Sequence, residues 1–162
     1  MKHTILISVV LFSLAVVTPS SAAPKAGGTF DEAADTALLA MSKRAEELAI
    51  KGVAVVAYVE GESTKAWSSK MLVVGSMKNA PTEKNKGVNL LAIAYTKAAE
   101  MADTLKDSGK AGRPPMTGET GWQGGLIQKG KSGYVIAAFS GGPAELDVKV
   151  SQAGLEVLAG KL

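Results

Sequence analysis

The sequence has no cysteine, and its only histidine is His3, which lies in a segment that we expect to be removed. The absence of cysteine excludes disulfide bonds, thiol redox chemistry and cysteine metal sites. Without histidine, the mature chain also cannot form a Ser-His-Asp or Cys-His nucleophile system or a histidine-based zinc site. Most familiar hydrolase mechanisms are therefore excluded, and stability must come from packing alone.

Strong charge of one sign is also missing. The chain has 18 Lys and Arg against 15 Asp and Glu, which leaves a formal net charge of only +3. Aromatic residues make up 5% of the chain, and no run of basic residues is interleaved with them. The sequence therefore predicts no nucleic-acid partner.

The N-terminal segment has the layout of a secretory signal peptide. A short basic start precedes an apolar run from Ile5 to Val17, and small residues from Ser20 to Ala23 offer a cleavage site. A membrane anchor is the alternative, but the apolar run is shorter than the roughly 20 residues that a spanning helix needs. We predict a signal peptide at 1–22 and one domain at 23–162, which is periplasmic or secreted and free of the membrane after cleavage.

The spacing of apolar residues predicts three helices and four strands. The helices are expected near 29–51, 90–105 and 143–158, and the strands near 53–59, 65–74, 125–129 and 134–139. We expect a capping box from Thr29 to Glu32 at the start of the first helix, and Gly52 as its left-handed end. Asn89 is expected to cap the second helix, and Pro143 to be the first residue of the third.

The order of these elements and their short turns predict an α+β fold. We expect an antiparallel sheet flanked by helices in a single compact domain. The apolar strands suggest that the sheet is dry on both faces, with one face covered by another subunit of a homo-oligomer. The segment 77–88 is expected to be an exposed loop, and the glycine- and proline-rich segment 110–124 to be the rim of a binding site.

Four short motifs then occur in an order that is seen in one family. They are Gly52–Val59, Ala94–Ala99, Gly124-Gly125 ahead of a hairpin, and Ala137–Gly142 followed by Asp147 in a helix. With these motifs the chain resembles the GlcG/HbpS-like haem-binding family, which includes the C-terminal domain of PduO-type proteins. The resemblance implies a compact antiparallel domain, assembly into oligomers and, for some members, haem or corrinoid binding. Because the mature chain has no histidine, haem would need Met, Tyr or Lys as its axial ligand, or would be bound by contact without strong ligation.

Six residues are candidates for ligand binding. The resemblance implies that Lys97 faces a pocket or an interface, although a solvated helix lysine is the alternative. The turn Ser140-Gly141-Gly142 could cradle an anion such as a propionate with its backbone N–H groups, or could be only a turn. In the long loop, Arg113 could pair with a carboxylate and Met116 could act as a soft ligand, or the two could be a surface arginine and a gap-filling methionine.

The leading functional prediction is an exported, non-catalytic protein that binds haem or another small molecule. A structural module that assembles without haem is the second hypothesis, and the missing histidine favours it. An enzyme is the third, with Lys97, Glu60 and Asp147 as acid-base groups, but no spacing in the sequence pairs them.

Overall fold

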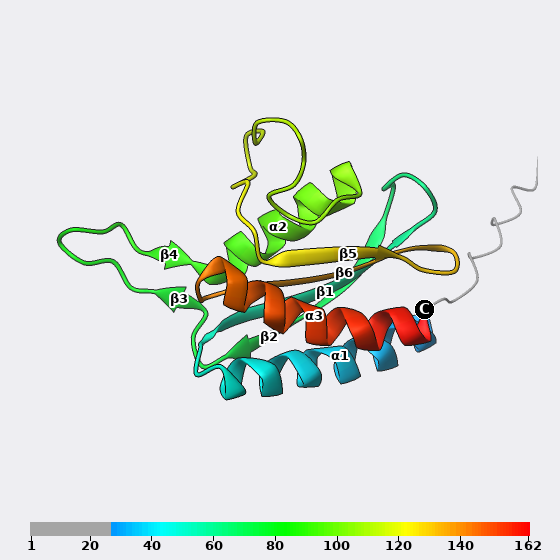
Figure 1. Cartoon of the computed structure of the whole chain (residues 1–162), viewed down its shortest axis with the longest axis horizontal. Coiled ribbons are helices and arrows are strands. Elements are labelled where there is room, and N and C mark those ends of the chain that lie inside the picture. The colour runs from blue at the N-terminus through cyan, green and yellow to red at the C-terminus, as the bar shows by residue number, and fades with distance from the viewer. Residues whose placement is uncertain (1–26) are drawn as a thin grey trace, which may run out of the picture.

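The computed structural model describes residues 27–162 as helices packed on an antiparallel sheet (Figure 1). The predicted signal peptide lies outside the described residues. The elements in chain order are α1 (Gly27–Glu47), β1 (Gly52–Glu60), β2 (Trp67–Val74), β3 (Lys78–Asn79), β4 (Val88–Asn89), α2 (Leu90–Thr104), β5 (Gly125–Lys129), β6 (Gly133–Ser140) and α3 (Ala144–Lys161). The α+β class predicted from the element order is confirmed.

The main sheet has the strand order β2-β1-β6-β5, and all of its neighbouring strands are antiparallel. The two valine- and alanine-rich strands, β1 and β6, are central, which explains why both are buried along almost their whole length. The strands β3 and β4 form a separate two-stranded sheet. Strand β3 lies inside the segment 77–88 and β4 begins at its last residue, so the prediction of a plain loop was wrong at both ends of the segment.

The chain's own helices cover both faces of the central strands (Figure 1). On one face, Ala54, Val56 and Phe139 pack in a core with α1 and α3. On the other, Val53 and Ile136 pack in a second core with α2. Alternate residues of a strand point to opposite faces, so each central strand needs apolar residues throughout. Helices of the same chain therefore bury both faces of the central strands, and no second subunit is needed to cover either face.

The starts of the helices follow the predictions in part. Asn89 caps α2 as predicted, because its side chain accepts a hydrogen bond from the Ala92 N–H at 3.0 Å. Helix α1 begins at Gly27, so Thr29 lies within its first turn and not at the capping position. Pro143 is the N-cap of α3, with φ −57° and ψ 148°, and not its first helical residue. The missing N–H of proline is tolerated at the cap as well, where no intrahelical partner exists.

The end of α1 corrects the prediction for Gly52. The left-handed residue after the helix is Ala49, with φ 53°. The Ala49 N–H donates to the Glu46 carbonyl and the Ile50 N–H donates to the Ala45 carbonyl, which is a Schellman motif. Gly52 instead begins β1, where a Cβ atom would collide with the backbone carbonyl of its partner strand in β6.

Helix α3 buries a face that is shifted from the predicted one. Val150 is buried as predicted, but Leu146, Ala153 and Val157 are only half-buried. Its buried face is made of Asp147, Val150, Ser151, Gly154, Leu155 and Leu158. At Gly154, a Cβ atom would lie 2.5 Å from the sulfur of Met41 in α1. The predicted close packing at this glycine is confirmed. No helix within residues 27–162 is both long and apolar enough to span a membrane.

Candidate functional site

Helices α2 and α3 begin at the same end of the sheet (Figure 1). Residues of both helices line a cavity of about 300 Å³. Strand β6 ends there, and the last residues of the 110–124 loop close one side. The cavity is lined by Asn79, Val88, Leu90, Lys97, Trp122, Gln123, Ser140, Gly141, Gly142, Ala144 and Asp147. Four of the six residues predicted from the sequence therefore meet in one place: Lys97, Ser140, Gly141 and Gly142. We call this the Lys97 cavity.

Lys97 forms part of the base of this cavity. Its side chain is 2% exposed, so it is not a solvated helix lysine. The Nζ atom donates to Asp147 Oδ2 at 2.9 Å and to the Phe139 carbonyl at 2.7 Å. Burial lowers the pKa of Lys97 and raises the pKa of Asp147, while the attraction within the pair opposes both changes. The ammonium is therefore held by two partners within the protein.

Asp147 also occupies the turn that precedes α3. Its Oδ1 atom accepts a hydrogen bond from the Gly142 N–H at 2.8 Å, and the Gly141 N–H also stabilises the carboxylate. These are N–H groups that the sequence suggested for an external anion. An external anion could bind these N–H groups only by displacing the Asp147 carboxylate. Lys97 and Asp147 were both candidates from the sequence, but their pairing could not be predicted because they lie 50 residues apart in the chain.

Gly124 brings the backbone of the loop against the buried pair. Its φ is +128°, and a Cβ atom would collide with Lys97 Nζ and lie 2.8 Å from Asp147 Cβ. Its carbonyl oxygen accepts from the Ser151 hydroxyl at 2.7 Å and from the Phe139 N–H at 3.0 Å. Glycine is therefore required at this position by both conformation and space.

The remaining lining of the Lys97 cavity carries no net charge. Asn79, Gln123 and Ser140 supply amide and hydroxyl groups, and Ser140 is 5% exposed. Trp122 lies at the rim with 54% of its surface exposed. No pattern in the sequence distinguished Asn79 or Gln123. Trp122 could have been recognised from the sequence, because it is the only aromatic residue in the 110–124 loop.

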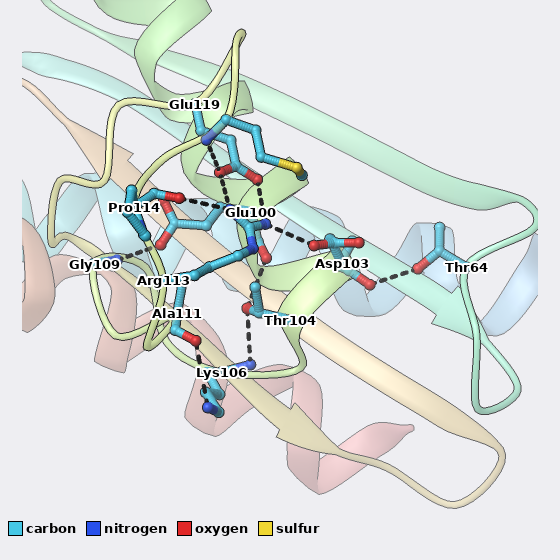
Figure 2. A network of polar contacts seen from close by, with 12 residues as sticks. Thr64, Glu100, Asp103, Thr104, Lys106, Gly109, Ala111, Arg113, Pro114 and Glu119 are labelled. Carbon is cyan, nitrogen blue, oxygen red and sulfur yellow. Dashed lines mark hydrogen bonds and ion pairs between the residues drawn. The ribbon is translucent and has the colours of Figure 1, made fainter.

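The two other predicted residues, Arg113 and Met116, do not line the Lys97 cavity. Arg113 lies beside Glu119 and Asp103 instead (Figure 2). Arg113 donates to Glu119 at 2.7 and 2.9 Å and to Asp103 at 2.7 Å. These carboxylates raise the pKa of Arg113, and the guanidinium lowers the pKa of Glu119 to about 2. Met116 is 52% exposed, and its backbone N–H donates to Glu119. Arg113 therefore pairs with carboxylates of this chain, as an arginine that holds its own loop.

The residues of the Lys97 cavity do not fit a ligated haem. Haem iron is held by His, Cys, Met or Tyr side chains, and the lining contains none of them. Lys97 is the only lining amine, and both the Phe139 carbonyl and Asp147 already bind it. The volume is also at the lower end of the range for small-molecule pockets, roughly 300–1,000 Å³.

Of the three acidic and basic groups considered for catalysis, only two meet. Lys97 and Asp147 bind each other, whereas Glu60 lies at the far end of β1. In the strand register Glu60 pairs with Gly133, while Val53, at the other end of β1, pairs with Ser140 beside the cavity. Geometry thus separates Glu60 from the buried pair by the length of a strand.

No model of a known protein family matches this chain, and no curated protein matches it. The resemblance to the GlcG/HbpS-like family therefore rests on its four motifs. Residues from three of them meet at one point of the fold. Lys97 comes from the second motif, Gly124 from the third, and Phe139 and Asp147 from the fourth.

Proposed function

We propose that this protein is an exported, non-catalytic binding protein for a small, uncharged polar molecule, which it holds in the Lys97 cavity. The observation that carries the proposal is the combination of a self-neutralised ion pair at the base with neutral hydrogen-bonding side chains around it. Export is proposed from the predicted signal peptide, with a periplasmic or secreted location. Membership in the GlcG/HbpS-like family is proposed from the four motifs.

The charge of the lining argues for a neutral ligand. Lys97 and Asp147 cancel each other, and the Gly142 N–H is already bonded to Asp147. A charged ligand would lose its hydration without gaining an unpaired opposite charge, which is unfavourable in a buried site. A neutral ligand needs only hydrogen bonds, and Ser140 and Gln123 offer them.

The shape of the lining narrows the class further. A cavity of about 300 Å³ suits a ligand of one ring or a similar size. Trp122 offers a flat apolar surface at the rim, against which a planar group gains contact area. We therefore expect a compact molecule with one flat face and amide or hydroxyl groups at its edge.

Matched pairs of neutral and anionic fragments test this proposal. Nicotinamide with nicotinate, and benzamide with benzoate, are titrated while the amide resonances of Gly124, Ser140 and Gly142 are followed by NMR. We expect saturable shifts with the amides and at least about tenfold weaker binding of the anions. The variant Ser140→Ala should weaken amide binding by roughly three- to tenfold, which is the usual effect of one lost hydrogen bond.

Two results would sink the proposal. One is the absence of saturable shifts with either neutral fragment, and the other is tighter binding of the anions. A titration with hemin separates the haem hypothesis from this one. We expect no Soret shift, because no axial ligand lines the cavity. A Soret shift that survives Ser140→Ala would place haem elsewhere on the protein.

Self-assembly is a second candidate function, favoured by an apolar surface on the edge strand β2. Trp67 and Val73 are 37% and 40% exposed, and Met77 just beyond the strand is 45% exposed. Trp67 and Val73 pair with Val59 and Val53, which belong to the core on the α2 side, so they point to that face. Exposed apolar side chains on an edge strand are a common feature of interaction surfaces.

Light scattering tests the assembly hypothesis. We expect a molar mass above that of one chain at high concentration, which returns to one chain in Val73→Lys. Leu39→Lys is the matched control, because Leu39 is 68% exposed on α1, on the opposite side of the sheet. A monomeric wild-type protein at high concentration would rule out this candidate.

A further inference from the structure

Glu100 is a buried carboxylate that the Lys97 cavity does not use. It lies on α2, three residues after Lys97, and is 1% exposed. Its Oε1 atom accepts a hydrogen bond from the Gly109 N–H at 2.7 Å. Its Oε2 atom is buried and has no hydrogen-bond partner within residues 27–162. A buried charged oxygen without a partner is costly, so such a group usually has an unseen one.

Glu100 lines a second cavity, of about 330 Å³, between α2 and the long loop (Figure 2). The other lining residues are Gly109, Ala111, Gly112, Arg113, Pro114, Pro115 and Gly121. Apart from Arg113 they contribute alkyl groups and backbone only. We call this the Glu100 cavity, and it shares no lining residue with the Lys97 cavity.

The charges around the Glu100 cavity leave one negative charge unbalanced. Arg113 is bound by Glu119 and Asp103. Lys106 reaches the Ala111 carbonyl at 3.4 Å, at the edge of the cavity (Figure 2). Two cations thus stand among three carboxylates when Glu100 is included. A ligand with a single positive charge would balance the group.

The lining favours an organic cation over a metal ion. Calcium takes six to eight oxygen ligands, and magnesium requires an octahedral shell. Within residues 27–162, no group of three or more His, Cys, Asp or Glu side chains is arranged to hold a metal. A single free carboxylate oxygen at one side of a wall of proline and alanine instead matches an ammonium group on an alkyl chain.

We propose that the Glu100 cavity binds a primary alkylammonium, with the ammonium donating to Glu100 Oε2 and the alkyl chain lying against Pro114 and Pro115. The Gly121 carbonyl is a second acceptor nearby, because it lies 3.1 Å from where a Cβ atom of Gly109 would be. This site is independent of the function proposed for the Lys97 cavity, and neither requires the other.

Titration of the purified protein with n-butylamine hydrochloride tests the site, with 1-butanol as the neutral probe of the same shape. The amide resonances of Gly109, Gly112 and Gly121 are followed by NMR at neutral pH and constant ionic strength. We expect saturable shifts with butylammonium and at least about tenfold weaker binding of butanol, because a hydrogen bond to a charged group is lost.

Three variants make the result specific. Glu100→Gln keeps the shape of the side chain and should abolish the saturable shifts. Ala111→Leu leaves every charge in place but fills the cavity, and should abolish them as well. Glu156→Gln removes an exposed carboxylate on α3 and should change nothing. Equal binding of butanol and butylammonium, full binding in Glu100→Gln or in Ala111→Leu, or shifts that sodium chloride reproduces would each overturn the proposal.

Discussion

Lys97 and Glu100 lie three residues apart on the same helix, and both are almost fully buried, with 2% and 1% of their surface exposed. The ammonium of Lys97 meets Asp147 and a backbone carbonyl. The carboxylate of Glu100 has one backbone N–H and one oxygen without a partner. Burial of a charge therefore says little about its role in this protein. The number of partners distinguishes a charge that holds the fold from one that is open to a ligand.

The largest effect is expected from breaking the Lys97–Asp147 ion pair. Lys97→Met leaves the Asp147 carboxylate buried without its partner, which should lower the free energy of unfolding by about 3–5 kcal/mol at neutral pH. Urea denaturation measures this loss. Lys110→Met is the control, because the Lys110 side chain is 63% exposed, and its effect should stay within about 0.5 kcal/mol.

The pH dependence of Lys97→Met tests the same explanation. Burial raises the pKa of Asp147 above its ordinary value, so the folded state takes up a proton at a higher pH than the unfolded state does. Stability linked to this carboxyl group therefore increases as the pH falls through its folded pKa. The deficit of Lys97→Met should shrink on acidification, and a deficit that is constant with pH would contradict the explanation.

A substitution at Gly124 should disturb the Lys97–Asp147 ion pair without removing either charge. Gly124→Ala would force a Cβ atom against Lys97 and Asp147. We expect a loss of about 1–3 kcal/mol from overpacking, in addition to the strain of a positive φ. Gly118→Ala is a matched control, because Gly118 also has a positive φ, of +94°, but has nothing within 4 Å of a new Cβ atom. Equal losses in urea denaturation would mean that contact with the pair is unimportant.

A smaller change in stability, of opposite sign, is expected when Glu100 is substituted. Glu100→Gln keeps an oxygen that can accept from Gly109 and removes a buried charge. Stability should stay unchanged or rise by up to about 1 kcal/mol. Asp147→Asn is the same chemical change in the Lys97–Asp147 ion pair. It should destabilise the folded protein, because it leaves the Lys97 ammonium without a counter-charge. Loss of stability in both variants would remove the distinction between the two sites.

The smallest effect concerns the rim of the Glu100 cavity. Arg113 holds the pKa of Glu119 at about 2, below its ordinary value, so the contribution of this pair is present above about pH 4.5. It is lost as the pH falls towards 2. The Met116 N–H donates to Glu119, so its protection against hydrogen exchange, measured relative to the intrinsic exchange rate at each pH, should decrease over this interval. Glu119→Gln should remove the pH step, while Glu156→Gln should retain it.

Sequence reasoning performed best where the cause of a structure is local. The valine-rich strand β1 and the cap at Asn89 were predicted from neighbouring residues. It failed at Gly52, because local rules assign a helix end to glycine, whereas the partner strand β6 requires it in β1. Ala49 adopts the left-handed conformation instead, and no local rule favours alanine there.

For the binding residues, the sequence by itself determined the available chemistry. Without cysteine, and with histidine only at position 3, the protein depends on Lys, Asp and Glu side chains and on backbone groups. It also determined the α+β class, through the periods of its apolar residues. Only the tertiary structure decided which charges meet. Lys97 and Asp147 are 50 residues apart. The hydrogen bond to Glu100 comes from Gly109, which lies beyond the end of α2. Such pairings depend on how α2, α3 and the long loop pack, which no local pattern encodes.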